Sequence, residues 1–368
     1  MTKASMRRPL IRRTAQVAAV LGATTIIMGG IAQAQSLGGF PIREPGRKAY
    51  SGGDSGIKDI KKKSKLGPQQ IIVDVNGPGP YKSINKAIDD IAEGGVIYVQ
   101  HGVYNESLKI KKSVFIQGDR GPGRGVEINA PMNAPCLEFS PINGVSHAVV
   151  ANVKFAAKIN SSANACVDVQ RGVFTLKESD VLGSGVRPSV KISGGTVMLE
   201  KNRIAAGSEG IFVEQGHSLS QSFIIDNHID RNKIGVDIAS GSNSDVVIAG
   251  NEIFDNLDSG VKSSGYGGAK LIGNKIRNNK GAGIILDKYA KLSLIRHNDI
   301  LQNDGDGVAI PFGANSIIED NDIVGNNGLA IFVREGLEPK ITNNFIDNNF
   351  GDAKKKKRRK KRKDRERY

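Results

Sequence analysis

Asn251-Glu252-Ile253 belongs to a pattern that recurs every 23 to 25 residues through the C-terminal half of the chain. An asparagine is followed two positions later by isoleucine, as in Asn202-Arg203-Ile204 and Asn298-Asp299-Ile300. The recurring asparagines are Asn202, Asn227, Asn251, Asn274, Asn298, Asn321 and Asn344. A fixed period of this length is typical of a solenoid, in which each repeat stacks on the last because it cannot bury its own apolar face.

A glycine and a short aliphatic segment follow most of these asparagines. Examples are Gly210-Ile211-Phe212-Val213 and Gly235-Val236-Asp237-Ile238. Each repeat holds two further apolar segments, such as Val246-Val247-Ile248 and Glu252-Ile253-Phe254, so we predict three short strands per turn. Alternation within a strand places Ile211 and Val213 inside the solenoid and Phe212, Asp237 and Lys262 on its outer face.

The N-terminal part of the repeat region predicts a cap. Ile84, Ala87, Ile88 and Ile91 are spaced by three and four residues, which indicates a short amphipathic helix. It follows a predicted strand over residues 71–75. Because the first turn of a solenoid would otherwise expose its core to water, we expect this helix to cover that end.

The sequence then resembles a known superfamily. Gly95-Val96-Ile97-Tyr98-Val99, Gly102-Val103-Tyr104-Asn105-Glu106 and Gly118-Asp119-Arg120-Gly121 are similar to the N-terminal portion of right-handed parallel β-helix proteins of the pectin-lyase-like superfamily. The later Asn-x-Ile and Gly-Ile repeats resemble that superfamily's carbohydrate-binding and sugar-hydrolase repeats. The resemblance implies an all-β, right-handed parallel β-helix over residues 71–350. It also implies that the asparagines stack at the bend between the second and third sheets, where amides can bond to one another and to bent backbone.

The first 34 residues predict a signal peptide. Arg7, Arg8, Arg12 and Arg13 precede an apolar stretch, and Ala32-Gln33-Ala34 offers a cleavage site. A membrane anchor is the alternative, and the paired arginines also resemble part of a twin-arginine export signal. Cleavage would give a periplasmic or secreted protein without a transmembrane segment. Residues 35–70, with glycines and a lysine run, predict a flexible linker.

The net charge of +15 is concentrated at the termini. Residues 354–368 hold twelve Lys or Arg and two acidic residues, and residues 35–353 hold 35 of each sign. We predict a disordered polybasic tail over residues 351–368 that attaches to a polyanion such as lipopolysaccharide, an anionic membrane surface or an acidic polysaccharide. A solubilising tail without a partner is the alternative, and no dedicated nucleic-acid site is expected. The predicted binding residues are Lys354, Lys355, Lys356, Lys357, Arg358, Arg359, Lys360, Lys361, Arg362 and Lys363.

The only two cysteines lie in similar contexts, Cys136-Leu137-Glu138-Phe139 and Cys166-Val167-Asp168-Val169. In a solenoid they would lie in neighbouring turns, near enough for a disulfide after export. Two stacked, reduced cysteines are the alternative, because lateral pairs between parallel strands have awkward disulfide geometry.

The resemblance implies that the glycine-led strand belongs to the first sheet, whose outer face carries the active sites of pectate lyases. The outward column is Glu138, Asp168, Lys191, Phe212, Asp237, Lys262, Ile285, Ala309 and Phe332. The candidate catalytic residues are Asp168, Lys191, Glu214, Asp237 and Lys262. Such a site could abstract the proton beside a sugar carboxyl group. Alternatively, Asp168 with Lys191 and Asp237 with Lys262 form cross-strand ion pairs, each contributing roughly 0.2–1 kcal/mol.

The sequence lacks the polygalacturonase, pectinesterase and alginate-epimerase signatures. The chain has no Trp and five His, and we expect His217, His228 and His297 to be corner or surface residues. We predict no metal site and no cofactor. The first hypothesis is therefore an exported scaffold that recognises an acidic envelope or extracellular polysaccharide. The second is a polysaccharide lyase or epimerase acting on a uronic-acid-containing glycan, so the sequence leaves catalysis open.

Overall fold

The computed structural model describes residues 67–119, 125–214, 220–239, 244–265, 268–287, 293–312 and 316–352. The predicted signal peptide, most of the predicted linker and the basic residues 354–363 lie outside these ranges. Within the described ranges, no helix is both long and apolar enough to cross a membrane.

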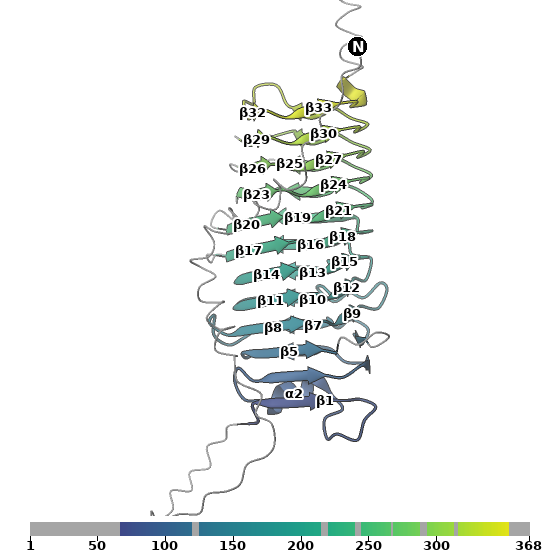
Figure 1. Cartoon of the computed structure of the whole chain (residues 1–368), viewed down its shortest axis with the longest axis vertical. Helices are drawn as coiled ribbons and strands as arrows, with labels where there is room; N and C mark the ends of the chain where they lie inside the picture. The colour runs from purple at the N-terminus through teal and green to yellow at the C-terminus, as the bar shows by residue number, and fades with distance from the viewer. Residues whose placement is uncertain are drawn as a thin grey trace, which may run out of the picture. The chain divides into compact units, whose positions relative to one another are not determined.

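The strands form three parallel sheets, named here A, B and C (Figure 1). Sheet A contains β1 (Gln70–Val73), β2 (Val96–Val99), β5 (Val114–Gly118), β8 (His147–Ala151), β11 (Val173–Lys177), β14 (Thr196–Glu200), β17 (Ser220–Ile225), β20 (Ser244–Ala249), β23 (Gly268–Ile272), β26 (Leu294–Arg296), β29 (Ile317–Glu319) and β32 (Lys340–Thr342). Sheet B contains β3 (Gly102–Tyr104), β6 (Val126–Asn129), β9 (Lys154–Ala156), β12 (Asp180–Leu182), β15 (Arg203–Ala205), β18 (His228–Asp230), β21 (Glu252–Phe254), β24 (Lys275–Arg277), β27 (Asp299–Leu301), β30 (Asp322–Val324) and β33 (Phe345–Asp347). Sheet C contains β4 (Leu108–Ile110), β7 (Leu137–Phe139), β10 (Val167–Val169), β13 (Val190–Ile192), β16 (Glu209–Glu214), β19 (Ile234–Ala239), β22 (Val261–Ser263), β25 (Ile284–Leu286), β28 (Val308–Ile310) and β31 (Ile331–Val333).

Each turn of the chain contributes one strand to each sheet, and each strand pairs with its counterpart in the next turn. For example, β19 pairs in parallel with β22, and β18 pairs with β21. The inward residues of successive turns, such as Val236, Val261 and Ile284, are fully buried in one continuous apolar core. The prediction of an all-β, right-handed parallel β-helix is confirmed.

The predicted cap is also confirmed. Helix α2 (Ile84–Asp90) lies beside β1 at one end of the stack, and Ile84 and Ala87 are fully buried against the core (Figure 1). Ser83 caps its N-terminus by accepting a hydrogen bond from the Lys86 backbone N–H. The Glu106 carboxylate accepts a further bond from the backbone N–H of Ile84, so groups that a helix terminus leaves without intrahelical partners are satisfied.

The recurring asparagines form a ladder at the bend between sheets A and B. From Asn227 onward, each side-chain oxygen accepts hydrogen bonds from the asparagine of the preceding turn, as Asn251 does from the backbone N–H and the amide of Asn227. The oxygen of Asn202 accepts a hydrogen bond from the Ser179 backbone N–H. The residue before each ladder asparagine has a positive φ, for example Asp226 at 55° and His297 at 57°. This left-handed residue bends the chain so that the next side chain points inward.

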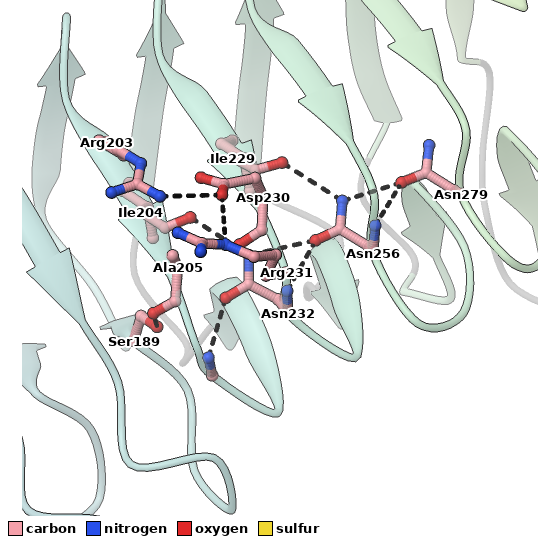
Figure 2. A network of polar contacts seen from close by, with 11 residues as sticks. Ser189, Arg203, Ile204, Ala205, Ile229, Asp230, Arg231, Asn232, Asn256 and Asn279 are labelled. Atoms are coloured by element: carbon pink, nitrogen blue, oxygen red, sulfur yellow. Dashed lines mark hydrogen bonds and ion pairs between the residues drawn. The ribbon is translucent and has the colours of Figure 1, made fainter.

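A second ladder, which the sequence analysis missed, lies at the bend between sheets B and C (Figure 2). Its members are Asn232, Asn256, Asn279, Asn303, Asn326 and Asn349, each five residues after an asparagine of the first ladder. The ladder explains the recurring glycine. A Cβ on Gly235 would come within 3.0 Å of Asn256 Nδ2 and still closer to the carbonyl oxygen of Gly260, so only glycine allows this approach.

Cys136 and Cys166 form a disulfide between neighbouring turns, with their Cα atoms 4.7 Å apart. Each cysteine comes directly before a sheet C strand, β7 or β10, and both are buried. Of the two alternatives that the sequence left open, a disulfide or two reduced cysteines, the structure therefore has the disulfide.

Candidate functional site

The outer face of sheet C brings the predicted candidate residues onto five consecutive strands. Strand register places Asp168 beside Lys191, and Phe212 beside Asp237. Asp237 in turn lies beside Lys262 of the next turn. Glu214 lies on β16, two positions after Phe212 and beside Ala239 of the next turn. The sequence period therefore predicts the alignment of this outward column correctly.

The charge pairing within the column differs from the expected cross-strand pairs. Lys191 Nζ lies 2.6 Å from Glu214 Oε2, so this lysine forms a diagonal ion pair with the next strand. The sequence predicted that Lys191 would pair with Asp168. Asp168 is only 4% exposed, and its burial raises the pKa of its carboxyl group. Hydrogen bonds from the side chains of Asn164 and Gln170 and the charge of Lys191 oppose that shift. Asp168 is thus enclosed among protein partners and is poorly placed to meet a ligand.

Asp237 is the most perturbed group on this face. Its pKa is raised from 3.8 to about 6, chiefly because the carboxyl group is buried. The positive charge of Lys262 lowers the pKa, and the negative charges of Glu209 and Asp287 contribute to the rise. The Oδ1 atom of Asp237 is buried and makes no hydrogen bond to any described residue. A desolvated carboxyl group with an unsatisfied oxygen costs folding free energy, and such groups concentrate at functional sites.

Phe212, Asp237 and Lys262 occupy three successive turns of the outward column, which are spaced about 4.8 Å apart. All three side chains are partly exposed. A partly exposed aromatic ring can stack on an apolar sugar face, the carboxyl group can exchange hydrogen bonds with hydroxyls, and the ammonium group can bind a carboxylate. Because its pKa lies near neutral, Asp237 can also take up or release a proton.

The histidines that are described lie away from this face. His228 is exposed on sheet B, where its Nε2 lies 3.4 Å from Glu252 Oε2. His297 occupies the left-handed position before Asn298 at the bend between sheets A and B. His217 lies outside the described residues.

Another buried carboxyl group, which was not predicted, lies on sheet B (Figure 2). Asp230 Oδ2 lies 3.1 Å from Arg203 and 2.7 Å from Arg231, and the side chain is only 6% exposed. Burial raises its pKa, whereas the charge and hydrogen bond of Arg203 lower it. The sequence carried a signal for this buried carboxyl group. Asp230 is a charged residue at a repeat position that holds the apolar residues Phe254 and Leu301 in later turns. The two arginines make this group a structural ion pair rather than a proton carrier.

Within the described ranges, no cluster of three or more His, Cys, Asp or Glu residues is arranged to hold a metal ion. The carboxyl groups of Asp304 and Asp306, which are close in sequence, contact protein groups. Asp304 lies 3.2 Å from Lys280, and Asp306 accepts a hydrogen bond from the Leu329 backbone N–H at 2.6 Å.

Solved structures with a similar fold include a protein titled Geobacillus virus E2 ORF18, with 15% identity, a TM-score of 0.51, and coverage of 72% of this chain and 56% of that one. The Dettilon tailspike protein is 14% identical with a TM-score of 0.50, covering 71% of this chain and 63% of that one. A periplasmic alginate epimerase, AlgG, is 15% identical with a TM-score of 0.47, covering 69% and 75%. The chain thus spans less than two thirds of the first two proteins, and these identities show a common fold alone.

No curated protein matches the chain by sequence. One protein family does match it, the family described as the right handed beta helix region, over residues 167–288 and 259–354. The two matches together span residues 167–354, just over half of the 368 residues. The chain therefore belongs to the right-handed β-helix family.

Proposed function

We propose that this chain is an exported β-helix that binds a uronic-acid-containing polysaccharide along the outer face of sheet C. The observation that supports it most is the unsatisfied, buried oxygen of Asp237 between Phe212 and Lys262. A sugar hydroxyl could supply the missing hydrogen bond while the ring of Phe212 stacks on a sugar face. Export rests on the predicted signal peptide over residues 1–34.

A uronate suits this face because of the paired properties of Asp237 and Lys262. Lys262 offers a positive charge to a uronate carboxylate. When Asp237 is protonated, its carboxyl group can donate a hydrogen bond to the same uronate carboxylate. When Asp237 is ionised, its negative charge repels that carboxylate. With a pKa of about 6, Asp237 changes between these states within the ordinary pH range. A glycan extending over several sugars would cross several turns of the stack, which sheet C presents in continuous register.

Binding of a short oligogalacturonate is therefore expected to be about three- to tenfold tighter at pH 5 than at pH 8, since removing one nearby like charge is worth on the order of 1 kcal/mol. Uronate carboxylates remain ionised over this range, and the lysines and arginines of the tail remain charged. Asp237→Asn carries a permanent neutral amide, so it should bind at pH 8 as the wild type binds at pH 5. Isothermal titration calorimetry at both pH values tests this expectation. A wild-type affinity that is independent of pH, or an unchanged pH dependence in Asp237→Asn, would contradict it.

A lyase or epimerase is the second candidate, and the pKa of Asp237 is the observation that favours it. As a base, Asp237 would take the proton at C5 of a uronate while Lys262 stabilises the developing enediolate. In a lyase the electron pair would then form the C4–C5 double bond, and the C4–O bond would break with protonation of the leaving oxygen. In an epimerase the proton would return to the opposite face.

The two candidates are separated by incubating the protein with alginate, polygalacturonate and hyaluronan. A lyase produces unsaturated sugars that absorb near 235 nm, and proton NMR detects epimerised residues. The scaffold proposal expects neither product. If the protein converts a glycan and Asp237→Ala abolishes this turnover, the enzyme hypothesis replaces the scaffold hypothesis. Glycan binding without turnover would support the scaffold hypothesis.

A further inference from the structure

The outer face of sheet B carries a column of mostly charged side chains that follows the whole stack. Strand register places one outward residue from each of the eleven strands in this column, from β3 to β33 (Figure 1). The sign of the charge alternates from Glu127 to Arg203 and again from Glu252 to Asp299. In chain order, what we call the charge column is Val103, Glu127, Lys154, Asp180, Arg203, His228, Glu252, Lys275, Asp299, Asp322 and Phe345.

The charge column is open to solvent. The side chains of Arg203, His228 and Lys275 are 43%, 60% and 49% exposed. Val103 and Phe345 form the two ends of the column, and these apolar residues are 51% and 60% exposed. A surface that fits the column must therefore offer opposite charges along its length and an apolar side chain at each end.

The symmetry of sheet B allows a second copy of the chain to offer this surface. Strand β18 is the central strand, with five strands on either side. A two-fold axis in the interface, parallel to β18, would lay sheet B of one copy on sheet B of the other with the order of the turns reversed. Each strand would then face the strand equally far from β18 on the opposite side, so β15 faces β21, and β3 faces β33. His228 would lie at the axis and face its own copy.

In this arrangement the charges of the column are complementary to themselves. Residues that are one, two or three turns from His228 on one side face the oppositely charged residues that are equally far on the other side. Exposed ion pairs contribute little affinity singly, but opposite charges across an interface fix its register. Because of the symmetry, each of three pairs occurs twice, namely Arg203 with Glu252, Asp180 with Lys275, and Lys154 with Asp299.

The two ends of the column also meet in this arrangement. Val103 would face Phe345 of the other copy, so the exposed apolar side chains at both ends would be covered together. Next to them, Glu127 would face Asp322, which is the one pair of like charges in the column. Lys154 lies 2.8 Å from Glu127 and reduces this repulsion.

The second outward column of sheet B fits the same arrangement. Leu301 would lie opposite Ala156, so a large side chain would face a small one. Leu182 would lie opposite the aliphatic stem of Arg277, which can pack on it. All four of these residues are partly exposed. Asp230 would lie near the axis, but its side chain is only 6% exposed, so it would not meet its copy.

The charges select one register from its neighbours. A shift of one copy by one turn would place Asp180 opposite Glu252 or Asp299, depending on the direction, and like charges would repel. The register in which the charges match is also the one in which the two sheets overlap completely. Eleven strands about 4.8 Å apart make a face about 48 Å long. With the flanking bends, such a face approaches the roughly 800 Å² per partner of a standard protein interface.

We propose that two copies of this chain associate through the outer faces of sheet B, about a two-fold axis at His228. The interface does not include Asp237, which lies on sheet C. The proposal therefore stands independently of the polysaccharide site.

The mass of the protein in solution tests the association. Without residues 1–34, the predicted signal peptide, the chain should sediment as a dimer in analytical ultracentrifugation. Ala156→Arg places a long charged side chain opposite Leu301 and should weaken the dimer about tenfold or more. Thr196→Arg is the matched control, because Thr196 is partly exposed on the outer face of sheet A, and it should leave the dimer unchanged.

Chemical crosslinking tests the register. The two cysteines of the chain form the disulfide, so an introduced cysteine supplies the only free thiol. Packed sheets lie about 10 Å apart, which is too far for a disulfide, so a short bismaleimide is the suitable reagent. His228→Cys should link to its own copy. Lys275→Cys should not link to itself, but it should link to Asp180→Cys when the two variants are mixed.

Three results would overturn the proposal. The first is a monomer at every concentration up to about 100 μM, where an interface of this size should be populated. The second is a dimer that Ala156→Arg leaves as tight as the wild type. The third is linking of Lys275→Cys to itself as fast as His228→Cys, or no linking in the mixture. Glycan binding should be the same in Ala156→Arg and the wild type, so failure here is distinguishable from failure of the polysaccharide site.

Discussion

Replacement of Asn251 by alanine should lower the free energy of unfolding by about 3–5 kcal/mol, because several buried polar groups lose their partners together. The Asn251 amide donates hydrogen bonds to the carbonyl oxygens of Ile224 and Ala249 and to the side-chain oxygen of Asn274. Its oxygen accepts bonds from the backbone and the side chain of Asn227. The side chain is 1% exposed, so water cannot replace these partners without rearrangement. Urea denaturation followed by circular dichroism measures the loss.

Asn344→Ala is the matched control for this substitution. Asn344 is the last described asparagine of the same ladder, and it accepts the same two bonds from Asn321 and donates to the Ile318 carbonyl oxygen. It is only partly buried, so water can take over its partners, and we expect a loss of about 1 kcal/mol. If both substitutions lowered the free energy of unfolding by the same amount, the contribution of a ladder asparagine to stability would not depend on its burial. That result would contradict this account.

The sequence predicted the first ladder because the asparagine and the isoleucine recur together with one period. The second ladder carried an equally regular signal, five residues after the first, yet it was not recognised. Its asparagines lack the companion that marks the first ladder, because the residue two positions later is Asp258, Gly281 or Gly305 and not a constant isoleucine. The left-handed residue before each asparagine does not distinguish the ladders, because it precedes the asparagines of both and varies in type.

The alignment of the candidate site was predictable, whereas its chemistry was not. Period-two alternation fixes which side chains share the outer face of sheet C. It does not fix where a long lysine points, and Lys191 contacts Glu214 on a diagonal instead of pairing only with Asp168. Likewise, the pKa of Asp237 depends on its burial and on Glu209 and Asp287, which lie on other turns. Such shifts require the three-dimensional arrangement.

The raised pKa of Asp237 makes a prediction about stability that is independent of any ligand. The folded protein binds the Asp237 proton more tightly than the unfolded chain, with a pKa of about 6 against an ordinary value of 3.8. Below pH 3.8 both states are protonated and the folded state bears no penalty. As the pH rises through 6, the folded state must ionise a buried carboxyl group, and stability is lost.

The full penalty above pH 7 is about 3 kcal/mol if each pKa unit contributes 1.36 kcal/mol, and residual solvent access reduces it to about 2 kcal/mol. Asp237→Asn has nearly the same shape and cannot ionise. It should therefore be more stable than the wild type by about 2 kcal/mol at pH 8, and the difference should vanish below pH 4. Urea midpoints across this range measure it.

Glu127→Gln on sheet B supplies a control of opposite sign. Lys154 Nζ lies 2.8 Å from the Glu127 carboxylate and holds its pKa below the ordinary value, so ionisation of Glu127 favours the folded state. This variant should be less stable than the wild type at pH 8 and should approach it on acidification, the reverse of Asp237→Asn. If Asp237→Asn were no more stable than the wild type at pH 8, the buried carboxyl group would already be satisfied, and the main argument for a ligand at that position would be lost.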